Sequence, residues 1–185
     1  MTPMSPWTRS WGPPTSGSFY ATFPAAPKRR RGTMGKYTLT IIKEDCCGCH
    51  ACEVACKQEH GLGVGPRLIR VEERSPFFIP LYCHHCAKPP CREACPVEAI
   101  YRDENGVVRI KGEECIGCRE CVTACPFGAM QFDQDRETAV KCDLCRERTS
   151  QGSAPACCLI CPTRCIIWGE TGALLDRLAA AKGKA

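Results

Sequence analysis

Sixteen of the nineteen cysteines in this 185-residue chain fall into four groups of four, and this spacing constrains the fold more than any other feature. Each group, here called a quartet, begins with a Cys-x-x-Cys pair. Closely spaced cysteines let one loop contact a single inorganic centre from several sides. The four quartets, in chain order, are Cys46, Cys49, Cys52 and Cys56; Cys83, Cys86, Cys91 and Cys95; Cys115, Cys118, Cys121 and Cys125; and Cys142, Cys145, Cys157 and Cys161.

Three kinds of structure use cysteine this heavily: disulfide scaffolds, zinc sites and iron–sulfur clusters. Disulfides fit poorly, because the total is odd, no signal peptide is visible and the pairs are too tight for ordinary bridges. Zinc takes four tetrahedral ligands, which keeps a zinc-stabilised binding module as an alternative. The third quartet, followed by Pro126, has the bacterial ferredoxin spacing C-x-x-C-x-x-C-x-x-x-C-P. We therefore predict that all sixteen quartet cysteines bind four [4Fe–4S] clusters.

The same spacing predicts that the quartets exchange ligands. In the ferredoxin pattern the fourth cysteine lies one helical turn beyond the third and points at a neighbouring cluster. Adjacency pairs the second quartet with the third, and elimination pairs the first with the fourth. The predicted ligand sets are Cys83, Cys86 and Cys91 with Cys125; Cys115, Cys118 and Cys121 with Cys95; Cys46, Cys49 and Cys52 with Cys161; and Cys142, Cys145 and Cys157 with Cys56.

A repeated Cys-Pro motif organises the body of the chain. It occurs at Cys95-Pro96, Cys125-Pro126 and Cys161-Pro162, where each proline is expected to end the ligand helix and fix the turn. We predict an α+β fold for residues 34–172, built from two pseudo-symmetric bacterial-ferredoxin-like modules. The inner module is residues 75–135, and the outer module combines residues 36–74 with 136–172.

Local patterns predict the elements between the quartets. Residues 38–43, 68–72 and 77–82 are expected to form short strands, and residues 53–60 a helix. The dipeptide Asn105-Gly106 predicts a hairpin that joins 99–101 to 107–110. Residues 146–155 are polar and are predicted to form a loop. Trp168 and its apolar neighbours are expected to cap the outer module, and residues 173–185 to form a helical tail.

The first 33 residues differ from the rest of the chain. They contain six of the fifteen prolines and show no periodicity, which predicts a disordered leader. The run Arg29-Arg30-Arg31 is not followed by a hydrophobic segment, so an export signal is not favoured. Codons for this run can form a purine-rich ribosome-binding sequence, and we infer that translation could start at Met34.

Composition excludes several classes of function. The formal net charge of +5 comes from residues 1–33, and the remaining residues carry twenty basic and twenty acidic side chains. Four oxidised clusters with their thiolates would add about −2 each, so the loaded body is acidic and nucleic acid is not an expected partner. The sequence contains no stretch of about 20 apolar residues, the length that a membrane span requires. Reduced thiols as ligands indicate a reducing compartment, and we expect a cytoplasmic protein.

At three places the sequence resembles a known family. The segments are CHHCAKPPC from Cys83 to Cys91, KCDLC from Lys141 to Cys145, and CPT from Cys161 to Thr163. They are similar to the four-cluster iron–sulfur subunits of molybdenum- and tungsten-pterin oxidoreductases, hydrogenases and carbon monoxide dehydrogenases. In that family the two inner quartets pair and the two outer quartets pair. Residues 55–71 look most like small subunits of tungsten-containing aldehyde oxidoreductases and benzoyl-coenzyme A reductases.

The resemblance and the quartets together predict an electron-transfer subunit without catalysis of its own. No catalytic triad, phosphate loop or dinucleotide motif is present in the sequence. Two partners are expected. One is a separate catalytic subunit, for which a pterin enzyme is favoured and a hydrogenase or carbon monoxide dehydrogenase is the alternative. The other is a ferredoxin or another redox carrier. A free-standing polyferredoxin that serves several enzymes is the alternative.

Five further residues near the quartets have two interpretations. Cys47, Cys158 and Cys165 lie outside the quartets, where small buried packing is expected and a substitute ligand is the alternative. His84 and His85 lie inside a cysteine loop. They are expected to fill the loop, and a hydrogen bond to a cluster sulfur is the alternative.

Overall fold

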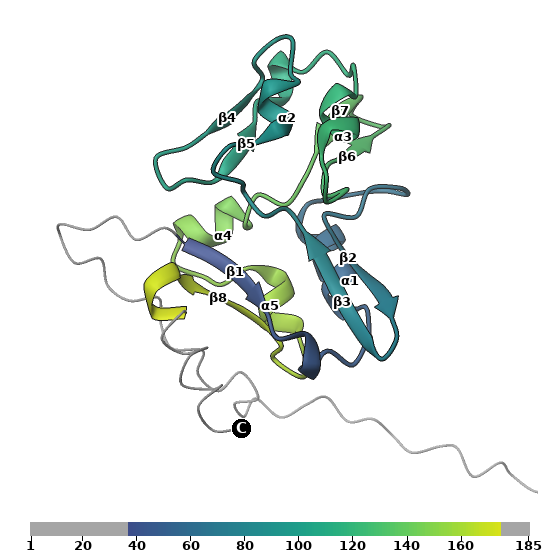
Figure 1. Ribbon diagram of the computed structural model, residues 1–185, viewed down its shortest axis with the longest axis vertical. Helices are drawn as coiled ribbons and strands as arrows, with labels where there is room; N and C mark the ends of the chain where they lie inside the picture. The colour runs from purple at the N-terminus through teal and green to yellow at the C-terminus, as the bar shows by residue number, and fades with distance from the viewer. Residues whose placement is uncertain (1–36, 175–185) are drawn as a thin grey trace, which may run out of the picture.

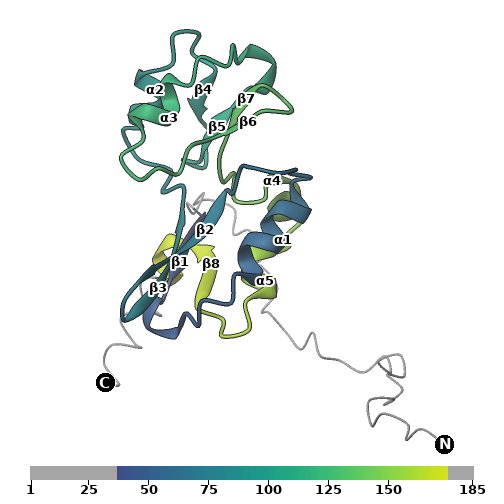
Figure 2. The ribbon, with the colours of Figure 1, turned by 90° about the vertical axis from the view of Figure 1, so that its right-hand side faces the viewer.

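Four two-stranded antiparallel sheets and several short helices make up residues 37–174, the part of the chain that the computed structural model describes. They form two lobes, which both views separate clearly (Figures 1 and 2). The elements are β1 (Tyr37–Ile41), a 3-10 turn η1 (Lys43–Asp45), α1 (Ala51–Glu59), β2 (Ile69–Arg74), β3 (Phe77–Tyr82), α2 (Pro90–Glu93), β4 (Ile100–Arg102), β5 (Val108–Ile110), a 3-10 turn η2 (Gly112–Glu114), α3 (Glu120–Ala124), β6 (Gln131–Asp133), β7 (Thr138–Val140), α4 (Arg146–Ser150), α5 (Ala156–Ile160) and β8 (Ile166–Glu170).

Three of the sheets are hairpins between neighbouring strands, and the fourth joins the two ends of the described chain. β2 pairs with β3, β4 with β5, and β6 with β7, whereas β1 pairs with β8 over the register Tyr37↔Glu170 to Ile41↔Ile166. In the β4–β5 turn, one carboxylate oxygen of Asp103 accepts hydrogen bonds from the Asn105 and Val107 N–H groups at 3.0 and 2.8 Å. The expected α+β character and the predicted hairpin at Asn105-Gly106 are therefore confirmed.

Two pairs of short helices form the centres of the lobes. α2 packs against α3 in one lobe, here called the inner lobe, and α1 packs against α5 in the other, here called the outer lobe. Each of the four helices carries the third cysteine of one quartet. The fourth cysteine of that quartet follows four residues later, at or near the carboxyl end of the helix. Buried side chains form a separate apolar cluster in each lobe, one around Met130 and one around Leu68. Cysteines from two different quartets are thereby brought to the same helix–helix contact.

Three arginines join the lobes by hydrogen bonds to main-chain carbonyl groups. Arg70 of β2 donates to Gly128 at 2.6 Å, and Arg109 of β5 donates to Asp143 at 2.6 Å. Arg136, in the β6–β7 turn, donates to His60 at 3.0 Å. Because an arginine bond to a carbonyl group is directional, these contacts fix how one lobe sits on the other.

The four Cys-x-x-Cys pairs share one backbone conformation. The residue directly before the second cysteine has a positive φ in each pair: 68° at Gly48, 47° at His85, 71° at Gly117 and 60° at Leu144. This left-handed region costs a residue with a side chain about 1–2 kcal/mol. That His85 and Leu144 adopt it indicates that the turn, and with it the direction of both sulfurs, is imposed by the surrounding structure.

The three Cys-Pro motifs also share a turn. The N–H group three residues after the cysteine donates to the cysteine carbonyl group, from Glu98 to Cys95 at 3.3 Å, from Gly128 to Cys125 at 3.1 Å, and from Arg164 to Cys161 at 3.2 Å. The donor residues have φ values of 52°, 55° and 55°. Proline supplies the fixed φ that begins such a turn and cannot continue the helix.

Some elements differ from the sequence-based expectations. Residues 146–150 form the single-turn helix α4, within the segment 146–155 that was predicted as a loop. Tertiary bonds stabilise this turn, because Arg148 contacts the Glu59 carboxylate at 3.0 Å and the Ala154 carbonyl group at 3.1 Å. Residues 171–174 are helical, while the rest of the predicted tail, the leader and Met34 lie outside the described residues. Within residues 37–174 the helices are too short and too polar to cross a membrane.

Gly117 provides a test of the imposed turn. A Cβ atom at this position would lie 2.9 Å from the main-chain oxygen of Glu137, and its φ is 71°. We expect Gly117→Ala to lower the free energy of unfolding by about 1–3 kcal/mol, because the strained φ and the contact with a backbone atom both oppose the side chain. Thermal unfolding followed by circular dichroism under argon measures the change.

The matched control is Gly112→Ala in the same segment, since a Cβ atom there has no neighbour within 4 Å. It should leave the unfolding midpoint close to that of the unchanged protein. Equal midpoints for the two variants would show that the turn at Gly117 is not constrained.

Candidate iron–sulfur centres

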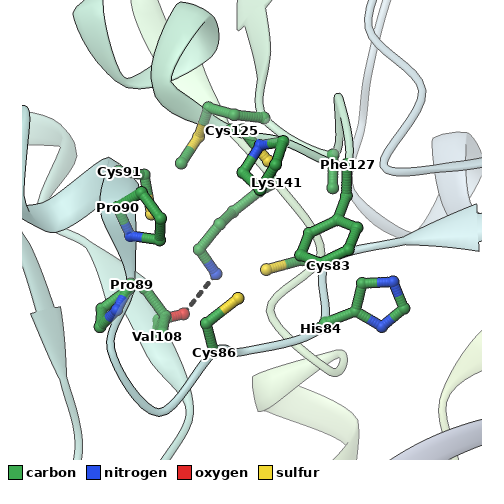
Figure 3. Close-up of a pocket in the computed structure, with 13 residues that line it drawn as sticks. Cys83, His84, Cys86, Pro89, Pro90, Cys91, Val108, Cys125, Phe127 and Lys141 are labelled. Atoms are coloured by element: carbon green, nitrogen blue, oxygen red, sulfur yellow. Dashed lines mark hydrogen bonds between the residues drawn. The ribbon is translucent and has the colours of Figure 1, made fainter.

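The first candidate centre lies in the inner lobe, and Figure 3 shows its side chains. Cys83 and Cys86 come from the loop after β3, Cys91 from α2, and Cys125 from the end of α3. These four thiols line one cavity together with Lys141. The cavity thus holds three cysteines of the second quartet and the last cysteine of the third.

A second cavity in the same lobe shows the reciprocal exchange. Cys115, Cys118 and Cys121 line it together with Cys95, which ends the second quartet. Burial, followed by the charges of Cys115, Cys118, Cys91 and Cys95, raises the pKa of Cys121 to about 11. The eight inner-lobe cysteines therefore line two cavities, four in each, and each cavity combines cysteines of two quartets.

In the outer lobe the thiols of the fourth quartet meet Cys56 of α1. Burial, followed by the charges of Cys157 and Cys145, raises the pKa of the Cys56 thiol well above its usual range. Burial and the charges of Cys157 and Cys56 likewise raise the pKa of Cys142. Cys56 is thus influenced by Cys145 and Cys157 of the fourth quartet and also by Cys52 of its own, and Cys142 is influenced by Cys157 and Cys56.

Cys161 and Cys165 are in contact in the outer lobe. The sulfur of Cys161 lies 3.5 Å from the sulfur of Cys165, and the Cys165 pKa is raised to about 12 by burial and by the charges of Cys161 and Cys46. Burial and the charges of Cys157 and Cys49 contribute to raising the pKa of Cys52 to about 12. Cys161 therefore contacts Cys165, Cys165 lies near Cys46, and Cys52 lies near Cys49 and Cys157.

This donor set fits an iron–sulfur cluster. A thiolate, not a thiol, ligates metal, and several buried thiolates close together repel one another without a cation between them. Bound metal reverses the balance, because its positive charge favours ionised sulfur. Four thiolates, one for each iron, are the ligands that a [4Fe–4S] cluster requires.

Two polar side chains near the cysteines have positions that the sequence did not reveal. The buried ammonium group of Lys141 lies among the sulfurs of the first centre (Figure 3), and its charge opposes the rise in the pKa of Cys83. His60 Nε2 lies 3.7 Å from the sulfur of Cys145 and 3.5 Å from the carboxylate of Asp143. Lys141 was visible only as part of the KCDLC motif, and His60 only as the end of a predicted helix.

The two histidines of the second quartet differ in environment. His85 Nδ1 accepts a hydrogen bond from the Val108 N–H group at 3.2 Å and lies 4.0 Å from the Cys83 sulfur. Burial and the charges of Lys141 and Arg109 lower its pKa to about 3, so the ring is neutral. His84 is exposed and packs edge-on against Phe127. His85 therefore fills the loop and supports β5, and His84 covers its outer side.

The three cysteines outside the quartets do not share one environment. Cys158 and Cys165 are buried, as packing residues are expected to be. Cys47 is exposed, which corrects the expectation of buried packing. Its side chain points outward because it occupies the second position of a Cys-x-x-Cys turn, as exposed His84 and Ile116 also do. Trp168 stacks on Tyr37 across the β1–β8 pair at 5.2 Å, so it caps the outer lobe as predicted.

Comparison with known proteins agrees with this chemistry. A family model described as a 4Fe-4S dicluster domain matches residues 75–171. The thiosulfate reductase electron transfer subunit PhsB of Salmonella typhi is 37% identical over 146 residues, which cover 73% of this chain and 76% of that protein.

Two further relatives are named as parts of other reductases. A component of the anaerobic dimethyl sulfoxide reductase of Haemophilus influenzae is 33% identical over 150 residues, covering 72% of this chain and 73% of that protein. A component of the tetrathionate reductase of Salmonella typhimurium is 34% identical over 152 residues, covering 76% of this chain and 61% of that protein. The chain therefore belongs to the 4Fe–4S dicluster family and has [4Fe–4S] clusters as its cofactors, which confirms the resemblance to iron–sulfur subunits of oxidoreductases seen in its sequence.

Proposed function

We propose that this chain is the electron-transfer subunit of an oxidoreductase complex, relaying single electrons through four [4Fe–4S] clusters. The observation that carries the proposal is that eight cysteines of the inner lobe line two cavities, each combining two quartets, in a chain of the 4Fe–4S dicluster family. Each bound cluster supplies a one-electron couple. The protein's own part is to hold the thiols, exclude water and fix the separation between neighbouring sites.

Exchanged ligands support short steps between clusters. Cys91 and Cys95 lie four residues apart around α2, yet they line different cavities. Cys121 and Cys125 do the same around α3. One turn of helix therefore spans the distance between two ligand sets, which keeps neighbouring clusters close. We assign the two lobes to an inner and an outer ferredoxin-like module related by pseudo-symmetry, and β7, which pairs with β6, belongs to the inner module although the sequence placed the boundary at residue 135.

The catalytic subunit of the complex is proposed to be a molybdopterin or tungstopterin enzyme, because three relatives are named as parts of thiosulfate, dimethyl sulfoxide and tetrathionate reductases. Catalysis belongs to that partner. The second partner is a ferredoxin or another redox carrier. We place the protein in the cytoplasm, where reduced thiols can acquire iron.

The iron content tests the number of clusters. Protein produced and purified without oxygen should contain about sixteen irons and sixteen sulfides per chain, since four [4Fe–4S] clusters need that number. It should be brown and should give electron paramagnetic resonance signals after reduction. A colourless protein that contains zinc would instead support a zinc-stabilised module, and markedly fewer than sixteen irons would contradict the four-cluster proposal.

Paired cysteine substitutions test the exchange of ligands. Cys125→Ala should cost one cluster, about a quarter of the iron. Adding Cys91→Ala should cost no more, because both residues are proposed ligands of one cluster. Adding Cys121→Ala instead should cost a second cluster. The two double variants would give the reverse result if each quartet bound its own cluster, and Cys158→Ala, a buried cysteine outside the quartets, is the control that should keep all the iron.

Co-purification tests the complex. A tagged chain isolated without oxygen from its own host should retain a larger subunit in a fixed ratio, and that subunit should release an oxidised pterin on denaturation. A fully loaded chain that elutes alone in the same preparation, and that reduces several purified enzymes, would favour the free-standing polyferredoxin instead.

A further inference from the structure

Lys141 is a buried cation inside a site made of thiols. Only 5% of the residue is exposed, although it directly precedes Cys142 in a loop that connects the lobes. Its side chain extends among the sulfurs of Cys83 and Cys86 and lines the same cavity as Cys91 and Cys125 (Figure 3). The cation therefore belongs to the first candidate centre, whereas its chain neighbour Cys142 belongs to another.

The hydrogen bonds of Lys141 are made to neutral groups. Its ammonium donates to the carbonyl oxygen of Val108 and to that of Cys142, the latter at 3.0 Å. No carboxylate within residues 37–174 lies within 4.0 Å of it. Removing an ammonium group from water without a partner of opposite charge is unfavourable by several kcal/mol.

The other buried charges of the described chain do have such partners. Glu53 contacts Arg67 at 3.2 Å, and Asp133 contacts Arg136 at 3.6 Å. Arg109, close to Lys141 in the fold, contacts Asp103 at 2.9 Å. Lys141 thus differs from them in lacking a carboxylate, and the negative groups that share its cavity are the four cysteines.

We propose that the ammonium group of Lys141 is the fixed counter-charge of the cluster bound by Cys83, Cys86, Cys91 and Cys125, and that it raises the reduction potential of that cluster. The proposal rests on the ligand set given under the proposed function and adds a residue that sets the potential. One electron from a carrier takes the cluster and its four thiolates from a net charge of about −2 to about −3. A fixed cation stabilises the more negative, reduced state more, because the attraction grows with the charge.

The low dielectric of the site strengthens this effect. Two unit charges interact several times more strongly in a protein interior than in water, and salt screens a buried pair less than an exposed one. The four sites share one ligand type, so a cation at one of them distinguishes that cluster from the others. The Cys83 cluster is then easier to reduce than the same cluster would be without the ammonium group of Lys141.

Neutral substitutions of Lys141 test the proposal through the reduction potential of the cluster, which is measured without a catalytic assay. In the full chain loaded with clusters, Lys141→Met removes the charge and Lys141→Gln removes it while keeping a hydrogen-bond donor. Both should reduce the equilibrium constant for reduction of one cluster at least tenfold, which is about 59 mV for a one-electron couple. Redox titration monitored by electron paramagnetic resonance measures it, and the shifted signal should be the one that Cys91→Ala abolishes.

The matched control is Lys88→Met. Lys88 lies between Cys86 and Cys91, in the loop of the same cluster, but its side chain is exposed and its charge is screened by water. It should change the equilibrium constant less than twofold. An equal shift in the control, or no shift in either Lys141 variant with all iron retained, overturns the proposal.

Two further outcomes are distinguishable. Loss of iron from both Lys141 variants, with full iron in Lys88→Met, would show that Lys141 holds the fold of the site and would also overturn its role in the potential. Fewer than four clusters in the unchanged chain would count against the proposed relay. Sixteen irons per chain, with no change of reduction potential in the Lys141 variants, would be consistent with the relay and would reject only the proposed role of Lys141.

Discussion

Thiol groups take the place of much of the apolar core in this protein, and the rest of the structure depends on what neutralises them. Six of the fourteen buried residues in the outer-lobe cluster are cysteines, and two of the six in the inner-lobe cluster are cysteines. Such a core is cohesive only if the thiolates share cations, because their charges otherwise repel. Folding and cluster binding are therefore coupled, as they are where metal ligands form the centre of a small domain.

That coupling explains the strained turns. Leu144 and His85 adopt a positive φ that glycine occupies in the other two Cys-x-x-Cys loops, at Gly48 and Gly117. The strain is tolerated because the turn directs two sulfurs toward one point, and ligation offsets the cost of a left-handed residue. Short helices add the third sulfur and carry the fourth to a neighbouring site. Geometry is thus specified locally around each pair of cysteines and only then combined across the lobe.

This division between local and long-range structure decides what the sequence could reveal. The hairpin at Asn105-Gly106 and the Cys-Pro turns depend on residues that are neighbours in the chain, so their patterns predicted them. The β1–β8 pair joins strands from opposite ends of the described chain, and only β1 has a recognisable strand pattern. The β6–β7 hairpin crosses the predicted module boundary at residue 135. The sequence placed the boundary too early because Thr138–Val140 has no recognisable strand pattern of its own. No local pattern shows that Lys141 turns inward, since a lysine in a polar loop is ordinarily exposed.

The same reasoning applies to the electrochemistry. All four proposed sites use four cysteines, so ligand identity cannot make one cluster easier to reduce than another. What differs is the surroundings of the sulfurs. Cys49 and Cys118 are exposed, and water near a cluster favours its more highly charged state. The Cys83 site is instead shielded and shares its cavity with the ammonium of Lys141, and Cys145 has His60 at 3.7 Å. We therefore expect the order of potentials along the relay to depend on a few polar side chains around the quartets and on their exposure to water.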